Sequence, residues 1–228
     1  MTSRLSSAKR PGVAAATARS AHVPGESAAA ATGEPPLDTR EAILRAAIDI
    51  LQREGAGALT VRSVASAAGC STTGVYTWFG GKNGLVDAIF VDGFHRFGDA
   101  VAVDGSAAPN PLDSLRAQAH AYRNWALANP THYMVMFGRA VPDYEPTEEA
   151  VLASYATFEP LVASTTAAIA AGWLVGEPFD VARHLWACIH GYVSLEVADM
   201  DMATSLEQRG LWYEDGLARA IRGCMPER

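Results

Sequence analysis

The 228-residue chain has few cysteines, and their arrangement does not indicate a disulfide framework or a metal site. Cys70, Cys188 and Cys224 are odd in number and lie far apart in the sequence. Disulfide scaffolds use an even number of cysteines, and zinc sites use closely spaced pairs such as C-x-x-C. We therefore expect three buried thiols, with no disulfide, no metal ion and no cofactor.

The sequence also lacks a long apolar segment. No hydrophobic run approaches the length of a membrane-spanning helix, and the first residues do not form the continuous apolar stretch of a secretory signal. Hydrophobic residues make up 49% of the chain and charged residues 19%, which is typical of soluble globular proteins. We expect a cytoplasmic protein that does not contact a membrane.

Recognisable catalytic motifs are missing as well. The histidines show no H-E-x-x-H spacing, and no serine or cysteine lies in a nucleophile turn. Gly80-Gly81-Lys82 is not a nucleotide-binding loop, because the earlier glycine is absent and Asn83 replaces the required Ser or Thr. Adjacent carboxylates such as Glu148-Glu149 diverge on a helix and cannot act as a pair. We predict no catalytic residue and no enzymatic activity.

Strand-like alternation is absent too, and helical periodicity continues from about residue 38 to the end. The first helix is expected to begin near Asp38 and to end at Gly55, and a fourth to run from Lys82 to a loop at residues 104–111. Later helices are predicted at residues 112–128, 131–138, 146–172, 178–199 and 203–223. The sequence therefore predicts an all-α fold.

Residues 60–85, TVRSVASAAGCSTTGVYTWFGGKNGL, predict two short helices joined by a turn. Thr60 is a suitable N-cap for the first, whose apolar positions Val61, Val64, Ala65 and Ala68 follow at helical spacing. Gly69 can adopt the left-handed conformation that ends a helix. We expect the chain to turn at this glycine.

The second short helix is expected to be capped by Ser71 and to bury Val75 and Phe79. Its other faces carry hydroxyl and aromatic side chains, which are Thr72, Thr73, Tyr76, Thr77 and Trp78. This pattern is typical of a helix-turn-helix, whose second helix enters the major groove of DNA. A helical hairpin that serves only as core is the alternative.

The same stretch resembles the DNA-binding signature of the TetR family of transcriptional regulators. The string Y-x-x-F-x-x-K-x-x-L, which starts at Tyr76 and ends at Leu85, is complete, and the resemblance covers roughly residues 38–98. Two positions depart from the family pattern, since Thr73 stands where glycine is frequent and Trp78 where His or Tyr is commoner. These departures affect the base contacts rather than the fold.

The resemblance implies a DNA-binding surface made of Thr60, Arg62, Ser71, Thr72, Thr73, Tyr76, Thr77, Trp78 and Lys82. For Lys82 there is an independent reason, because it opens a helix where free backbone N–H groups and the helix dipole also favour a phosphate. A solvated surface lysine is the alternative for this residue.

The C-terminal half resembles the W…H-G (WHG) group of TetR-type C-terminal domains. Trp186 and His190 are four residues apart and share a helix face, where they line a ligand site or pack in a core. Aromatic and methionine side chains on several helices suggest a site for an apolar small molecule. The candidate ligand-binding residues are Trp125, Tyr133, Met136, Phe137, Tyr155, Phe158, Trp186 and His190.

Charge is unevenly distributed along the chain. The net charge of −7 divides into +2 for residues 1–37, 0 for residues 38–97 and −9 for residues 98–228. Residues 1–37 are poor in large apolar groups and are expected to form a disordered basic arm, either a passive tail or a source of added DNA contacts. An acidic body disfavours non-specific binding to polyanions, which suits site-selective DNA binding.

Three segments are therefore predicted: the arm at 1–37, a three-helix helix-turn-helix DNA-binding domain at 38–84, and a helical ligand-binding and dimerisation domain at 85–228. The family resemblance implies a homodimeric repressor that binds a palindromic operator and leaves it when an apolar effector binds. A helical ligand carrier or enzyme without DNA binding is the alternative. The implied dimer seam is a four-helix interface that contains Leu185, Ile189, Leu195, Leu211 and Leu217.

Overall fold

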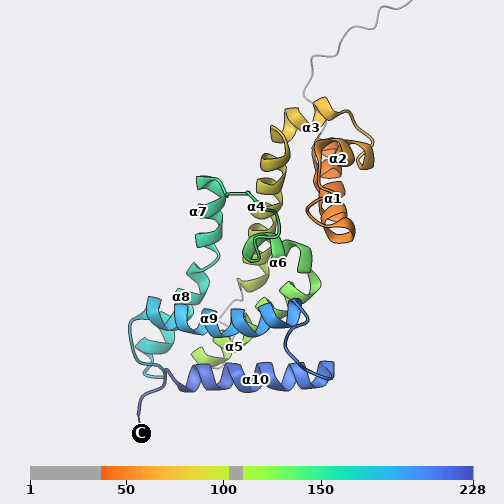
Figure 1. Ribbon diagram of the computed structural model, residues 1–228. Coiled ribbons are helices and arrows are strands. Elements are labelled where there is room, and N and C mark those ends of the chain that lie inside the picture. Colours follow the sequence, from red (N-terminus) through yellow and green to blue (C-terminus); the bar gives the residue numbers. More distant parts are fainter. Residues whose placement is uncertain (1–36, 103–109, 228) are drawn as a thin grey trace, which may run out of the picture. The chain divides into compact units, whose positions relative to one another are not determined.

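The computed structural model describes residues 37–102 and 110–227, and every regular element in these ranges is a helix (Figure 1). The predicted arm lies outside these ranges, apart from Leu37. The helices are α1 (Leu37–Glu54), α2 (Val61–Ala67), α3 (Thr72–Phe79), α4 (Lys82–Val101), α5 (Pro111–Ala128), α6 (Pro130–Phe137), α7 (Glu148–Ala156), α8 (Glu159–Ala170), α9 (Pro178–Val197) and α10 (Leu206–Arg222). The expected all-α fold is confirmed.

Most helix boundaries agree with the sequence pattern, but the helix expected at 146–172 was wrong. The chain forms α7 and α8 there, separated by Thr157 and Phe158. Pro160 lies in the first turn of α8, and a proline at that position lacks the N–H that a continuous helix requires. The break therefore separates two helices that both carry residues of the cavity described below.

Apolar side chains form one continuous cluster through the described part of the chain. It extends from Ile43 of α1 through Phe94 of α4 to Ile221 of α10. Helix α4 contacts α1 and α3 and also α5, α6 and α7, so it belongs to both the helix-turn-helix and the remaining helices. Cys224 is buried as expected, whereas Cys70 and Cys188 are half-buried. None of the described helices has the length and apolarity needed to cross a membrane.

A buried ion pair fastens α5 to α9. Arg123 donates two hydrogen bonds to the Glu196 carboxylate, from Nε at 2.8 Å and from Nη2 at 2.7 Å, and the Glu196 side chain is only 6% exposed. The guanidinium also lies 5.1 Å from the ring centroid of Tyr213 on α10. Tyr213 in turn donates to the Ala119 carbonyl oxygen of α5 at 2.6 Å. These contacts fix α5, α9 and α10 relative to one another.

We expect Arg123→Ala to lower the free energy of unfolding by about 3–5 kcal/mol, because it leaves the Glu196 carboxylate buried without a partner. Arg116→Ala is the control, since Arg116 pairs with Asp113 at the surface and should cost at most about 1 kcal/mol. Chemical denaturation of both variants measures the difference. Equal losses would show that the buried pair has no special role in stability.

Candidate nucleic-acid interface and ligand cavity

The turn between α2 and α3 is built as the sequence indicates. The hydroxyl of Thr60 accepts the backbone N–H of Ser63 at 3.0 Å, and the Ser63 hydroxyl accepts the N–H of Thr60 at 3.0 Å, which closes a capping box. Gly69 has a positive φ of 67°, and the Ser71 hydroxyl accepts the Gly74 N–H at 3.2 Å. Helix α3 therefore starts at a fixed point relative to α2.

Helix α3 has a buried face and an exposed face. Val75 and Phe79 point into the core with 0% and 8% exposure, whereas Tyr76 is 56% exposed. Thr72, Thr73 and Thr77 are exposed as well. The α3 surface, defined by Thr72, Thr73, Tyr76 and Thr77, therefore presents hydroxyls and one phenol to an approaching molecule.

Trp78 differs from the other predicted residues of α3. Its side chain is half-buried against the core, and its indole Nε1 is buried without a hydrogen-bond partner. Most of this ring therefore braces α3, and only part of it can reach beyond the protein surface.

The junction between α3 and α4 requires two glycines, each for a different reason. Gly80 ends α3 in the left-handed conformation with φ of 67°. Gly84 lies in the first turn of α4, where an added Cβ would lie 1.9 Å from the carbonyl oxygen of Phe79. No side chain fits at position 84 without moving one of the two backbones. The direction of α3 is thus set by direct contact with α4.

The remaining predicted DNA-binding residues surround this junction. Lys82 is half-buried at the start of α4, and its Nζ donates to the Ala56 carbonyl oxygen at 3.4 Å. Arg62 in the first turn of α2 is exposed. The Thr60 and Ser71 hydroxyls already accept first-turn N–H groups of their helices, and the Thr60 hydroxyl also lies 3.0 Å from the Ser63 hydroxyl. Ser71 therefore keeps its proton for a further acceptor.

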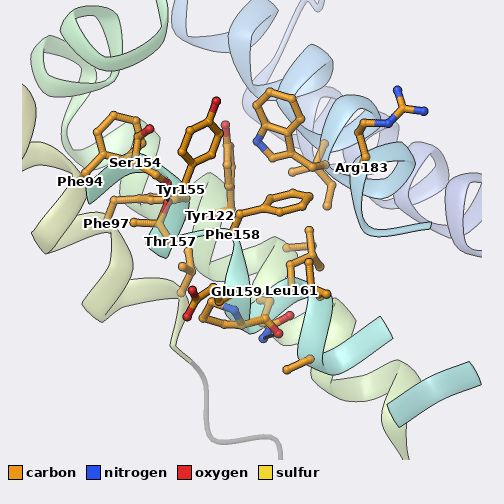
Figure 2. A pocket seen from close by; sticks show the side chains of 18 of the residues that line it. Phe94, Phe97, Tyr122, Ser154, Tyr155, Thr157, Phe158, Glu159, Leu161 and Arg183 are labelled. Carbon is orange, nitrogen blue, oxygen red and sulfur yellow. Dashed lines mark hydrogen bonds between the residues drawn. The ribbon is translucent and has the colours of Figure 1, made fainter. Parts of the chain in front are cut away.

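A second candidate site is a cavity of about 1100 Å³ whose lining residues come from α4 to α9 and from the α7–α8 junction. Its wall is rich in aromatic rings, and Figure 2 shows Phe94, Phe97, Tyr122 and Phe158 gathered around it. Tyr155 at the edge is 69% exposed. This volume is at or above the upper end of small-molecule sites, which span roughly 300–1,000 Å³.

The predicted ligand-binding residues fall into two groups. Met136, Phe137, Tyr155, Phe158 and Trp186 line the cavity. Trp125, Tyr133 and His190 do not line it but stand behind the wall. The Trp125 ring packs edge-on against Phe97 with centroids 5.3 Å apart.

Tyr133 and His190 support the wall through Tyr122. The Nδ1 atom of His190 lies 2.9 Å from the hydroxyl oxygens of both Tyr122 and Tyr133. The Trp186 ring stacks on the imidazole with centroids 5.2 Å apart and an angle of 25° between the planes. Burial lowers the pKa of His190 and raises the pKa of Tyr122, so both groups are held in their neutral forms near pH 7.

Comparison with known proteins decides the family. Residues 43–89 match the family model of bacterial regulatory proteins of the tetR family, and residues 115–212 match that of the tetracyclin repressor-like C-terminal domain. The HTH-type transcriptional regulator Rv1816 of Mycobacterium tuberculosis is 30% identical over 213 residues, which cover 78% of this chain and 90% of the relative. The chain belongs to the TetR family. It is therefore a transcription regulator, as these relatives are.

Solved structures agree with the TetR assignment. A protein of unknown function from Rhodococcus sp. RHA1 is 26% identical to this chain, with a TM-score of 0.70. The similarity covers 82% of this chain and 96% of the Rhodococcus chain. A TetR family transcription regulator from Marinobacter aquaeolei VT8 has the same fold at 19% identity and a TM-score of 0.64, covering 83% and 97%. The narrower likeness to the WHG group stays a prediction.

The expected TetR-type dimer seam needs a correction. Leu185, Ile189 and Leu217 are only 1%, 6% and 4% exposed within the single chain, so they offer almost no surface to a partner. They face inward because α9 packs against α5, α8 and α10 of its own chain. Leu195 and Leu211, by contrast, are 47% and 63% exposed.

The exposed leucines lie among other apolar side chains on α9 and α10. Tyr192 of α9 and Trp212 of α10 are 40% and 41% exposed, and together with Leu195 they border one small surface hollow. Leu211 lies two residues before the buried Tyr213 on α10, and Leu195 lies two residues after the buried Val193 on α9, so both leucines point away from the core. We call Tyr192, Leu195, Leu211 and Trp212 the α9–α10 face.

Several functional residues of this TetR-family chain were not singled out by the sequence, including Phe94 and Phe97 of the cavity wall. Three others have a specific structural role. They are Gly84, whose missing side chain lets α3 and α4 touch, Asp87, which binds the start of α7, and Gln118, a buried amide in the cavity wall. The glycine could have been noticed as an unusual residue inside a helix. The other two depend on contacts between residues distant in the sequence, which no local pattern reveals.

Proposed function

We propose that this TetR-family regulator is a homodimeric repressor that binds a palindromic operator through α3 and is released when a small molecule fills the cavity. The main support for this proposal is that α3 has one face anchored in the core and one face exposed. Val75 and Phe79 hold the helix against the core, and the α3 surface remains free to enter a major groove.

Each proposed DNA contact has a specific chemistry. The Tyr76 phenol and the threonine hydroxyls can bond base edges or phosphates, and a threonine methyl can pack on a thymine methyl. Thr77 uses its hydroxyl proton on the Thr73 carbonyl oxygen at 2.9 Å, which leaves its oxygen as an acceptor and its methyl free. Lys82 and Arg62 supply phosphate contacts on either side of α3.

Dimerisation is proposed because one short helix contacts too few base pairs to select an operator. A two-fold pair places two recognition helices about 34–36 Å apart, one turn of DNA. The α9–α10 face supports this arrangement, since four large apolar side chains are partly exposed there in the single chain.

Coupling between cavity and operator is proposed to pass through Asp87 of α4. Its carboxylate accepts hydrogen bonds from the Tyr144 hydroxyl at 2.8 Å, the Thr147 N–H at 3.0 Å and the Thr147 hydroxyl at 2.9 Å. Thr147 also caps α7 by accepting the Ala150 N–H. Helix α7 continues to Tyr155 in the cavity wall, so a shift of that wall acts directly on α4.

The first test concerns DNA binding. We expect selection from random duplexes to yield a palindrome whose affinity falls as salt rises. Lys82→Ala should weaken binding to all sequences alike, whereas Tyr76→Ala should also change the preferred bases by about 1–3 kcal/mol. Arg219→Ala on α10 is the control and should change neither. Absence of salt-dependent binding to duplex DNA would favour a ligand carrier instead.

The second test concerns the dimer. Leu211→Glu should weaken dimerisation at least about 100-fold, about 2.7 kcal/mol, because each protomer then buries an unpaired carboxylate in the seam. Leu152→Glu is a matched control, since Leu152 of α7 is also 63% exposed. Sedimentation equilibrium of both variants gives the dissociation constants. An unaffected Leu211→Glu dimer would place the seam elsewhere.

The third test concerns coupling. An effector found by screening should lower operator affinity roughly 5- to 150-fold in the wild type. In Asp87→Ala we expect this factor to fall below about twofold, while binding of the operator alone and of the effector alone stays nearly unchanged. Asp99→Ala, an exposed carboxylate on the same helix, should behave as wild type. Full coupling in Asp87→Ala would rule out this route.

A further inference from the structure

Three hydroxyl groups of the cavity wall, those of Ser154, Thr157 and Thr166, have already used their protons. Ser154 donates to the Val151 carbonyl oxygen, and Thr157 donates to that of Ser154, each at 2.7 Å. Thr166 donates to the Val162 carbonyl oxygen, also at 2.7 Å. A hydroxyl that donates to its own helix retains only oxygen lone pairs. These three groups therefore face a ligand as hydrogen-bond acceptors.

Gln118 adds a stronger acceptor to the same wall. Its side chain is 6% exposed, its amide nitrogen donates to the Pro160 carbonyl oxygen at 3.3 Å, and its Oε1 has no hydrogen-bond partner. The orientation of the amide is fixed, because a carbonyl oxygen can only accept and must face the NH2 group. A buried oxygen without a donor is unfavourable. Because neighbouring atoms cover Oε1, a ligand that donates to it displaces some of them, and the new hydrogen bond removes the cost of the unpaired oxygen.

Tyr122 does not supply a free donor either. Its hydroxyl donates toward the Tyr133 hydroxyl at 3.4 Å and lies 2.9 Å from Nδ1 of His190. In either tautomer of His190, the Tyr122 proton has a partner behind the wall. The phenol therefore presents its ring to the cavity and keeps its proton inside the protein.

Three positions at the start of α8, which borders the cavity, offer no N–H group to an anion. The N–H groups of Leu161 and Val162 both donate to the Phe158 carbonyl oxygen at 3.2 Å, and Pro160 has no N–H. The first turn of a helix binds anions through free N–H groups, and these three positions offer none.

Charged side chains at the cavity stay at its edge. Among the lining residues, Glu159 and Arg183 carry charge, and both are exposed. The Arg183 guanidinium lies 3.7 Å from the Asp180 carboxylate, and in Figure 2 it points away from the ring cluster. A carboxylate placed beside Gln118 would therefore be desolvated next to an acceptor oxygen, with no cation among the buried lining residues.

We propose that the cavity binds an uncharged, ring-bearing molecule that donates a hydrogen bond to Oε1 of Gln118, as a phenol or an aryl N–H does, and that it rejects carboxylates. Rings match the aromatic wall of Phe94, Phe97, Phe158 and Trp186. The proposal deepens the effector site described above and rests on that site being the cavity.

Three stilbenes with one scaffold test the proposal: trans-4-hydroxystilbene, trans-4-methoxystilbene and trans-stilbene-4-carboxylate. We expect the phenol to bind the full-length protein about tenfold more tightly than the methoxy compound, which has no donor, and more than tenfold more tightly than the anion. Titration calorimetry without DNA gives the three dissociation constants.

Gln118→Met removes the acceptor and keeps the length of the side chain. The tenfold preference for the phenol over the methoxy compound should disappear in this variant, so that the two compounds bind with about equal affinity. Gln52→Met, an exposed position on α1 outside the cavity, should retain the full preference. Thermal unfolding of each variant shows whether it is folded, and the wild-type ranking remains decisive if Gln118→Met is not.

Equal affinity for phenol and methoxy compound, tighter binding of the carboxylate, or no binding of any stilbene would each overturn the proposal. A retained preference in a folded Gln118→Met variant would overturn the assignment of Gln118. Operator binding is measured in separate experiments without stilbenes. Failure there would refute the proposed repressor while leaving the ligand ranking interpretable.

Discussion

The backbone contact between α3 and α4 is the constraint on which the rest of the structure depends. An added Cβ at position 84 would lie 1.9 Å from the Phe79 carbonyl oxygen, so the two helices meet without a side chain between them. A contact of backbone on backbone has little freedom to adjust, since no rotamer change can relieve it. The orientation of α3 is therefore a direct consequence of the position of α4.

Helix α4 transmits this constraint over its whole length. Its first turn holds α3, its second turn binds Tyr144 and Thr147 through Asp87, and its later turns place Phe94 and Phe97 in the cavity wall. A helix is stiff along its axis, so a displacement at one end moves the other. One element thus carries contacts of both candidate sites, which is the structural basis for the proposed coupling between them.

Local patterns predicted the helix-turn-helix in detail and the cavity only in part. The caps at Thr60 and Ser71 and the inward Val75 and Phe79 are decided within a few residues, so the sequence contained the necessary information. Trp78 and the buried Leu185, Ile189 and Leu217 were placed less well. Helical periodicity shows that a face is apolar, but not whether its own chain or a partner covers it. For the same reason Gln118 and Asp87 escaped notice: their partners Pro160 and Thr147 are 42 and 60 residues away.

The energetics of the two proposals are compatible. An unpaired buried amide oxygen costs about 1–3 kcal/mol, the same range as the coupling free energy of a typical allosteric switch. A ligand shifts a conformational equilibrium only through a difference in its affinity for the two states. Pro160 of α8 accepts the hydrogen bond that orients the Gln118 amide. If only one position of α8 keeps this amide within reach of the ligand, a ligand that donates to Gln118 binds that state more tightly than the other. The acceptor-rich wall would then select the ligand and, through α7 and Asp87, convert its binding into a movement of α4.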